Sequence, residues 1–310
     1  GVTNISVTVT DPEPHPVNQV QCRWRYNVDG GEYILGGQGL GSQFVVQFPE
    51  ESEHNLVIEC QDALGNRVHD EETFFVDKTP PGIGKWYGEP FLEKEDGEYI
   101  SSETPIFASV SDDGPHKSGI AEVKYRTTVV DDEACESVSV CQGTEGSSDW
   151  VSVDPEEFSV FEFSIEEESC HLIEIMATDN VNKSRTHKQC AFVDNSPPTP
   201  LKTVGEPKEP WDGLDANFYE LEEFCREGGN CWKVTLDTPI FMNCTDPEPH
   251  PVDQETIHFM VELDGDDATQ IYCEEYEGTY NETTGFCHLS ETIEEFHFLE
   301  SSEHNLKFYC

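Results

Sequence analysis

The octapeptide TDPEPHPV spans Thr10–Val17 and returns letter for letter at Thr245–Val252, an offset of 235 residues. A second shared stretch, SEHNL, lies at Ser52–Leu56 and again at Ser302–Leu306, where the offset is 250 residues. The last copy therefore carries 15 residues between the two stretches that the first copy lacks. Shared stretches that recur in the same order indicate a repeat architecture, in which each unit is one folded module.

The middle of the chain carries a more distant copy of the same unit. Its DDGPH at Asp112–His116 parallels DPEPH at Asp11–His15. The ends of the first and second units, which begin HNLVIEC and HLIEIMA, match at a constant offset of 117 residues, and both close with a double proline. We therefore expect three units, at residues 1–81, 82–200 and 201–310.

The unit ends alternate in polarity, with Leu56 and Ile58 on one face and Asn55 on the other. A period of two is typical of a half-buried β-strand. Gly65 of the first unit falls on Asn182 of the second, and both residue types tolerate the left-handed backbone of a tight turn. Each unit is thus predicted to close with a β-hairpin. Many short strands with turn signals indicate an all-β chain of β-sandwiches.

Two further expectations concern connecting segments. Residues 217–226 favour a turn or two of helix, and the glycine-rich run GGQGLG at Gly36–Gly41 is predicted to be a flexible hairpin loop. Trp86, Tyr87 and Trp211 follow the double prolines and are expected to serve packing between units.

The composition excludes nucleic acid as a partner. The chain has 310 residues with 17 Lys plus Arg against 64 Asp plus Glu, a net charge of −47. Phosphate backbones and anionic lipids would repel it. Its expected partners are divalent cations, basic surfaces or copies of itself. No stretch reaches the roughly 20 apolar residues that a membrane-spanning helix needs, so no such segment is expected.

The repeats resemble a known family. HNLVIECQDALGN with TFFVDKTPP, and HLIEIMATDNVNK with AFVDNSPP, look like the final strands of bacterial and archaeal Ig-like repeat domains of extracellular surface proteins and adhesins. TPIFASVSDDGPHKSGIAEVKY is similar to their opening strands. The resemblance implies tandem immunoglobulin-like β-sandwich domains. Such repeats usually contain few cysteines, whereas this chain has 12.

The ends of the chain fall inside repeat units. The first unit is expected to lack its first strand, and the third stops at Cys310, the counterpart of Cys60, so it is expected to lack its last. A longer repetitive chain would explain both ends. A neighbouring chain that supplies the missing strand is the alternative. Both imply a fibre or a long stalk.

Catalysis is not expected. The sequence has no H-E-x-x-H, G-x-S-x-G or P-loop motif, and the glycine-rich run misses the last position of a G-x-G-x-x-G because Ser42 stands there. Paired carboxylates, the requirement for glycoside hydrolysis, occur throughout so acidic a chain and discriminate nothing.

Cofactors are not expected, with calcium as the possible exception, because hard cations take oxygen ligands and the repeated loops supply carboxylates. The candidate ligands are Asp11, Glu13, Asp112, Asp113, Asp246 and Glu248, with Asp77 and Asp194 at the linkers. The recurring Asp-x-x-Pro-His also suggests a carboxylate and an imidazole for one metal per unit. The structural alternative is a loop in which Asp accepts backbone N–H bonds. The strand-leading histidines are expected to bond a neighbouring loop; they are His54, His171 and His304.

An even number of cysteines without a C-x-x-C pair indicates disulfides in an oxidising, extracellular or cell-surface compartment. Spacing predicts the pairs Cys170 with Cys190, Cys273 with Cys287, Cys135 with Cys141, Cys225 with Cys231, Cys22 with Cys60, and Cys244 with Cys310. Four glycosylation sequons point to the same compartment, at Asn4, Asn182, Asn243 and Asn281.

Two functional hypotheses remain from the sequence. The first is a structural repeat protein of an extracellular filament, sheath or cell-surface stalk. The second is an adhesin or receptor ectodomain that binds a ligand through its loops.

Overall fold

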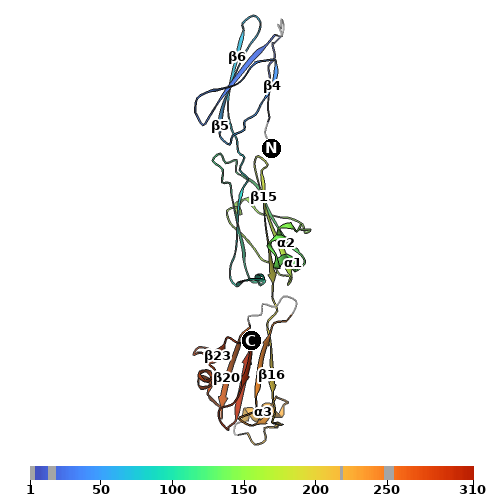
Figure 1. Cartoon of the computed structure of the whole chain (residues 1–310), viewed down its shortest axis with the longest axis vertical. Helices are drawn as coiled ribbons and strands as arrows, with labels where there is room; N and C mark the ends of the chain where they lie inside the picture. Colours follow the sequence, from blue (N-terminus) through green and yellow to red (C-terminus); the bar gives the residue numbers. More distant parts are fainter. Residues whose placement is uncertain (1–3, 13–18, 217–218, 248–254) are drawn as a thin grey trace.

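The computed structural model describes residues 4–12, 19–216, 219–247 and 255–310. Within these ranges the chain forms three β-rich units that follow one another along the long axis of the molecule (Figure 1). The described strands pair only within a unit. The predicted fold class is therefore confirmed: the chain is all-β, built from tandem sandwich-like units. The ranges 1–81, 82–200 and 201–310 stay a prediction, with β7 beginning at Gly82 and β16 at Thr199.

The first unit pairs a four-stranded sheet with a two-stranded one. Its strands are β1 (Ile5–Thr8), β2 (Gln21–Val28), β3 (Ile34–Leu40), β4 (Gln43–Val46), β5 (Glu53–Gln61) and β6 (Arg67–Phe75). The large sheet has the order β3-β2-β5-β6, and β1 pairs with β4. Alternation along β2 and β5 buries Cys22, Leu56 and Ile58 between the sheets. The closing hairpin β5–β6 turns at Gly65, whose φ is 92°.

The second unit has the largest sheet. Its elements are β7 (Gly82–Tyr87), β8 (Phe91–Lys94), β9 (Gly97–Ile100), β10 (Ile106–Ser111), β11 (Ile120–Val129), α1 (Glu133–Glu136), α2 (Val138–Gly143), β12 (Val151–Ser152), η1 (Pro155–Glu157), β13 (Phe161–Phe163), β14 (Cys170–Asp179) and β15 (Ser184–Val193). The sheet β13-β10-β7 faces the sheet β12-β11-β14-β15-β9-β8 across an apolar core. Asn182, with a φ of 62°, supplies the left-handed turn of the β14–β15 hairpin, as predicted.

The third unit repeats this plan with an insertion. Its elements are β16 (Thr199–Val204), β17 (Lys208–Pro210), α3 (Tyr219–Arg226), β18 (Trp232–Val234), β19 (Ile240–Thr245), β20 (Ile257–Leu263), β21 (Asp266–Asp267), α4 (Thr269–Glu275), β22 (Thr279–Asn281), β23 (Phe286–Leu289), β24 (Ile293–Phe296) and β25 (His304–Tyr309). The helix predicted for residues 217–226 is confirmed over Tyr219–Arg226 by α3, and residues 217 and 218 lie outside the described ranges. The inserted residues add α4 and β22, which the sequence did not indicate.

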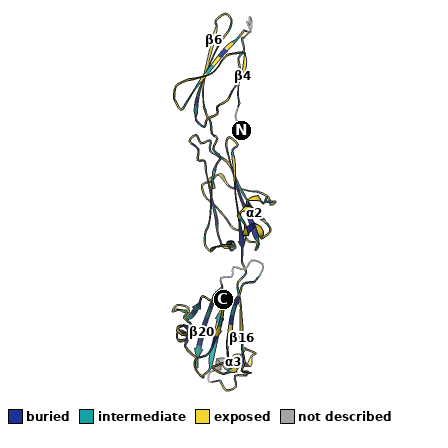
Figure 2. Cartoon of the chain, in the orientation of Figure 1, coloured by how far each residue is buried: buried dark blue, intermediate teal, exposed yellow. Residues whose placement is uncertain are grey.

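Each unit has its own core. Three main clusters of buried residues lie within single units and do not cross a junction (Figure 2). A fourth cluster gathers four cysteines at one end of the second unit. Burial therefore stabilises each unit separately, and the units meet through linkers and loops.

Two local predictions are wrong. The run Gly36–Gly41 is not a loop, because Gly36–Leu40 belongs to β3 and pairs with β2. A Cβ on Gly36 would lie 1.9 Å from an atom of the Trp24 ring, so the glycine lets that ring lie against β3.

Trp86 and Tyr87, which follow the first double proline, pack within the second unit rather than between units. Trp86 stacks on Phe107 with ring centres 5.7 Å apart, and Tyr87 stacks on Phe91 at 4.8 Å. For Trp211, packing between units stays a prediction; its backbone N–H donates to the carbonyl of Cys231.

Six disulfides cross-link the chain, each within a single unit. Four join the predicted partners, namely Cys22–Cys60, Cys225–Cys231, Cys244–Cys310 and Cys273–Cys287. Cys22 and Cys60 link the neighbouring strands β2 and β5, whereas the Cys244–Cys310 bond ties β19 to the end of β25 in the other sheet.

The predicted pairs Cys170–Cys190 and Cys135–Cys141 are wrong. The structure joins Cys135 to Cys170 and Cys141 to Cys190. The β14–β15 register places Cys190 opposite Leu172 and Cys170 opposite Phe192, so the two cysteines do not face each other. The helices α1 and α2 instead pack at this end of the sheet, and each brings one cysteine to one strand.

Candidate functional site

The region with the most buried acidic groups is the first junction, which we define as the linker residue Asp77 with Glu51 of the first unit and Asp112, Ser118 and Asp179 of the second. Asp77, Asp112 and Asp179 are 6%, 8% and 1% exposed. Carboxylates are rarely this buried without ionic or hydrogen-bonded partners. Each oxygen of these buried carboxylates is therefore expected to have a bonding partner.

The linker itself is fixed by a small turn. Asp77 Oδ1 accepts a hydrogen bond from the backbone N–H of Thr79 at 3.1 Å, and Glu51 Oε2 accepts one from the Thr79 hydroxyl at 2.7 Å. Lys78 Nζ donates to the carbonyl of Pro49. These bonds hold the linker against the first unit before it enters β7.

The dipeptide Ser118-Gly119 receives the linker on the side of the second unit. Its two N–H groups donate to different carboxylates, Ser118 to Asp77 Oδ2 at 2.9 Å and Gly119 to Asp112 Oδ2 at 2.6 Å. Its two carbonyls accept from Asn180, at 2.9 Å from the side chain and 3.0 Å from the backbone. Acids from the linker and the second unit therefore meet at one dipeptide.

Other contacts tie the units together across this junction. Lys183 Nζ donates to the backbone carbonyl of Asp77 at 2.8 Å. His116 Nε2 lies 3.3 Å from Asp29 Oδ1 in a turn of the first unit, and its ring lies 5.9 Å from the ring of Phe75. The junction is thus a set of specific polar and ring contacts rather than a free linker.

Asp179 differs from its repeat counterpart Asp62 in a revealing way. In both, Oδ1 accepts two backbone N–H bonds of the hairpin turn, at 2.8–2.9 Å. Asp62 Oδ2 also accepts from the Asn66 side chain at 2.7 Å, and this bond lowers the pKa of Asp62. Lys183 occupies the position of Asn66 but donates to Asp77 instead. Asp179 Oδ2 is therefore buried without a hydrogen-bond donor among the described residues.

Three more oxygens at the first junction share this condition. Glu51 Oε1, Asp112 Oδ1 and Ser118 Oγ are buried and have no hydrogen-bond partner in the described part of the chain. A Cβ on Gly114 would lie 2.5 Å from Glu51 Oε1 and 3.6 Å from Asp77 Oδ1, so the loop between β10 and β11 packs directly over these two acids.

The sequence-based metal candidates are only partly brought together. Asp112 lies in the first junction, whereas Asp113 Oδ1 accepts from the Ser111 hydroxyl on the exposed side of the loop. Asp11 and Asp246 lie at the corresponding loops of the outer units, and Glu13 and Glu248 fall outside the described residues. Across the described ranges, no group of three or more His, Cys, Asp or Glu side chains is arranged to hold one metal ion.

The Asp-x-x-Pro-His pair does not act as one metal-binding unit in the middle domain. Asp112 bonds the backbone of Gly119, while His116 pairs with Asp29 of the first unit. The structural alternative, a loop in which the Asp accepts a backbone N–H, fits these contacts. The corresponding residues His15 and His250 lie outside the described ranges.

The three strand-leading histidines bond neighbouring loops, as predicted. His54 and His171 are buried, and Nε2 of each lies 3.3 Å and 2.8 Å from the carbonyls of Glu50 and Glu167. His304 Nδ1 lies 3.2 Å from the carbonyl of Ser302 in the loop before β25, and its Nε2 lies 3.0 Å from the hydroxyl of Tyr272 in α4. Burial lowers the pKa of His304.

The second junction repeats the linker turn of the first. Glu168 and Asp194 stand 117 residues after Glu51 and Asp77. Glu168 accepts from the Ser196 hydroxyl at 2.9 Å and 3.0 Å, and Asp194 Oδ1 accepts from the Ser196 N–H at 3.0 Å. The sequence predicted Asp77 and Asp194 as linker acids but did not single out Glu51, Ser118 or Asp179. For Glu51, the constant offset that relates it to Glu168 was the signal that could have identified it.

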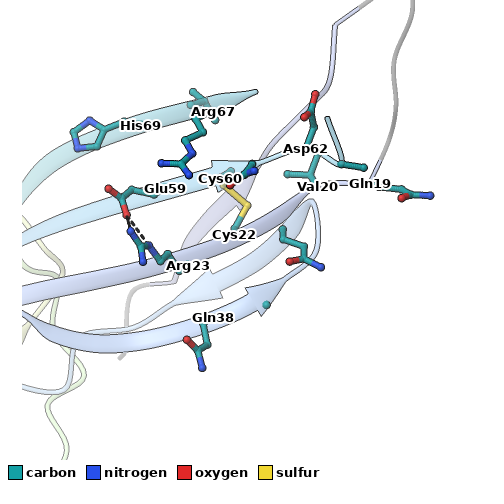
Figure 3. Close-up of a pocket in the computed structure, with 15 residues that line it drawn as sticks. Gln19, Val20, Cys22, Arg23, Gln38, Glu59, Cys60, Asp62, Arg67 and His69 are labelled. Atoms are coloured by element: carbon teal, nitrogen blue, oxygen red, sulfur yellow. Dashed lines mark hydrogen bonds and ion pairs between the residues drawn. A yellow bond between two sulfur atoms is a disulfide. The ribbon is translucent and has the colours of Figure 1, made fainter. Parts of the chain in front are cut away.

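A cavity lies at the far end of the first unit, beside the Cys22–Cys60 disulfide (Figure 3). Arg23 and Glu59 form an ion pair on its wall, and Arg67 contributes a second guanidinium. Asp62 also lines it. Because Asp62 is the counterpart of Asp179, this end of the first unit corresponds to the end of the second that receives a linker.

Three of the four sequon asparagines are exposed. Asn182 lies at the β14–β15 turn and Asn281 at the start of a turn in the inserted segment, and Asn4 precedes β1. Asn243 is half-buried in β19, which is paired on both sides. The first three therefore present their amides to solvent.

No family model matches the chain. No curated protein matches it either. No helix of the described residues is long and apolar enough to cross a membrane.

Several solved structures are similar to the chain over most of its length. One from a 1.5-MDa bacterial ice-binding adhesin covers 94% of this chain and 89% of its own, at 8% identity and a TM-score of 0.30. The structure of a Ca²⁺-stabilized, ice-binding adhesin of an Antarctic bacterium aligns with 99% of this chain and 67% of its own chain, at 10% sequence identity and a TM-score of 0.28. The structure of human CDH23 EC21-23 aligns with 98% of this chain and 96% of its own chain, at 13% sequence identity and a TM-score of 0.29. At these TM-scores the likenesses assign neither a function nor a ligand to this chain.

Proposed function

We propose that the chain is a structural segment of an extracellular filament, sheath or cell-surface stalk, in which Ig-like units repeat to build length. The observation that carries this proposal is the first junction. Its linker is bonded to the first unit through the Thr79 hydroxyl and Glu51, and to the second unit through Asp77 and the N–H of Ser118; His116 reaches back to Asp29. A fixed junction between repeats suits a part whose function is to span distance.

The proposed location outside the cell rests on chemistry. Six disulfides need an oxidising compartment to form and persist. Exposed sequon asparagines and a net charge of −47 suit a solvated surface. The proposed role is mechanical rather than catalytic, because the buried carboxylate of Asp77 bonds the linker to the second unit.

Immunogold electron microscopy of the source cells tests this function. An antibody against the folded chain should decorate fibres, a sheath or stalks outside the cell, with labels repeated along each structure. Labelling confined to the cell interior would refute the proposal. Single labels at the tips of short projections would favour the alternative, an adhesin or receptor ectodomain that binds a ligand through its loops.

A further inference from the structure

Two strands of the third unit have an open edge and line one groove. Among the described strands, β25 pairs only with β20, and β18 pairs only with β17. Both β25 and β18 line the same groove, together with β16. An open strand edge presents unpaired N–H and C=O groups, which form a template for a further strand.

The second unit shows how such a groove is filled. There the closing strand β15 pairs antiparallel with β14 and parallel with β9. β14 and β25 are counterparts, since both carry the strand-leading histidine of the repeat. Thr104 lies four residues after β9 and donates its hydroxyl to the carbonyl of Pro90. Thr238 lies four residues after β18 and donates to Pro207 in the same way. The groove of the third unit therefore has the position that β15 fills in the second.

The first unit indicates which apolar side chain the groove accepts. Its closing strand β6 places Phe74 opposite His54, and the ring centres of Phe74 and Phe48 are 5.9 Å apart. The counterparts of Phe48 and His54 stand 250 residues later, at Phe298 and His304, and both line the groove. Their rings stack with centres 3.9 Å apart. A phenylalanine at the Phe74 position of an added strand would pack on this ring pair.

A charged pair sets the chemistry of the other face. In the second unit Glu174 of β14 lies opposite Lys188 of β15, with Oε1 and Nζ 3.5 Å apart. The counterpart of Glu174 in β25 is Lys307, so the charge at this edge is reversed. Lys307 Nζ already lies 2.9 Å from Oε1 of Glu262, yet half of its side chain stays exposed. An added strand should therefore carry an acid here, because opposite charges across a strand pair stabilise it and like charges destabilise it.

The closing strand β6 has the acid that this position needs. Its Glu71 lies opposite Val57, the counterpart of Lys307. Glu71 Oε1 also accepts a hydrogen bond from Nδ2 of Asn55 at 3.0 Å, and the counterpart of Asn55 is Asn305. A strand with the chemistry of β6 would thus place its carboxylate beside Asn305 and Lys307.

We propose that this groove docks a β-strand of a neighbouring chain that has the chemistry of β6, with an acid opposite Lys307 and a phenylalanine on Phe298. The strand runs antiparallel to β25 and parallel to β18. A neighbouring chain is the source, because the described strands of this chain all have partners within their own units. The contact joins one chain to the next, and only this biological meaning rests on the function proposed above.

Fluorescence anisotropy of a labelled peptide with the sequence of residues 66–76, NRVHDEETFFV, tests the groove. The partner is the disulfide-intact chain, in about 0.15 M NaCl to screen diffuse attraction. We expect saturable binding of one peptide per chain. The matched control peptide carries Thr73→Pro, which should abolish this binding because proline interrupts strand pairing.

A charge exchange tests the register. The Lys307→Glu chain should bind the unchanged peptide less tightly than the wild-type chain does, by up to about fivefold. The Glu71→Lys peptide should bind the wild-type chain less tightly by a similar factor. Combining the two changes should restore affinity, because opposite charges face each other again. Equal affinity in all four combinations would contradict the register.

Hydrogen exchange guards against non-specific binding and misfolded variants. The peptide should slow exchange in residues 304–309 of β25 and leave residues 53–61 of β5 unchanged, because β6 already covers that edge. The absence of saturable binding, or equal binding of the proline peptide, would overturn the proposal. So would a chain that dimerises alone with β25 already protected, since a second copy of the same edge would then fill the groove. None of these results decides whether the chain forms a filament.

Discussion

Lys85 lies on the core-facing side of β7, where its charge works against the packing of the second unit. Its neighbour across the sheet is Ala108, which is fully buried. Lys85 Nζ stands 3.1 Å from the centre of the Tyr87 ring and has no hydrogen-bond acceptor among the described residues. Burial lowers the pKa of Lys85 from 10.5 to about 7, and the Glu98 carboxylate offsets this only in part.

The sign of the pH effect follows from proton counts. Between pH 7 and 10.5 the unfolded chain holds a proton on Lys85 that the folded chain has released, so stability rises with pH in this window. Below pH 7 Lys85 is protonated in both the folded and the unfolded state, and the full free-energy cost of burying its charge is present. At ~1.4 kcal/mol per pH unit, the lowered pKa corresponds to an upper bound of ~5 kcal/mol on that cost.

We expect the Lys85→Met variant to be more stable than the wild type at about pH 6, by as much as ~5 kcal/mol. Methionine keeps the unbranched stem and removes the charge. The difference should shrink as the pH approaches 10, because the wild-type lysine is then neutral in the folded state. Urea unfolding of the disulfide-intact chain, followed by pulsed hydrogen exchange of peptides from β14, reports the second unit separately.

Lys202 provides the matched control, since it occupies the equivalent position in β16, 117 residues later. Burial lowers its pKa too, but its Nζ donates to the carbonyl of Leu306 at 3.0 Å. The Lys202→Met variant should therefore gain less, or lose stability in the third unit. If Lys85→Met matches the wild type at both pH values, the proposed cost of the buried ammonium does not exist.

Three further predictions concern single features. The Arg126→Met variant should lose stability, by at most about 3–5 kcal/mol, because it removes the Nε atom 2.5 Å from Oε2 of the buried Glu174 and leaves that carboxylate with Lys188 Nζ at 3.5 Å; denaturation should show recovery in the double variant with Glu174→Leu. Glycopeptide mapping by mass spectrometry of the chain from a glycosylating source should show a glycan at Asn182, which sits exposed at a hairpin turn, and an unmodified residue there would count against an extracellular route. Non-reducing peptide mapping should recover Cys135 linked to Cys170, whereas a fragment joining Cys135 to Cys141 would contradict the structure.

The sequence was most informative where a pattern is local and repeated. Alternation from His54 to Cys60 and the glycine or asparagine at the turn were enough to place the β5–β6 and β14–β15 hairpins, because side-chain period and turn chemistry are set within a few residues. The repeat offsets then predicted equivalent strands and turns in the other units.

The misses have a common physical cause in contacts between distant residues. The pairing of Cys170 depends on a two-residue difference in register and on helices that follow β11, which no local pattern marks. The strand nature of Gly36–Leu40 depends on the Trp24 ring that lies against it. β-Structure is decided by such partners more than by intrinsic preference.

The first junction was predictable in part. Asp77 and Asp112 stood out as repeated acids, but a sequence does not show which carboxylate oxygen is left without a donor. That information came from the replacement of Asn66 by Lys183 at the turn, together with the side chain of Lys183 reaching Asp77 rather than Asp179. Only the three-dimensional arrangement distinguishes these outcomes.

Small-angle X-ray scattering of the disulfide-intact chain tests the central claim, that three units form one extended array. A compact protein of this length would have a radius of gyration of about 20 Å. The end-to-end arrangement in Figure 1 predicts a clearly larger value and a rod-like scattering profile. A radius close to that of a compact globule would contradict the account, because the units would then have to fold back on one another.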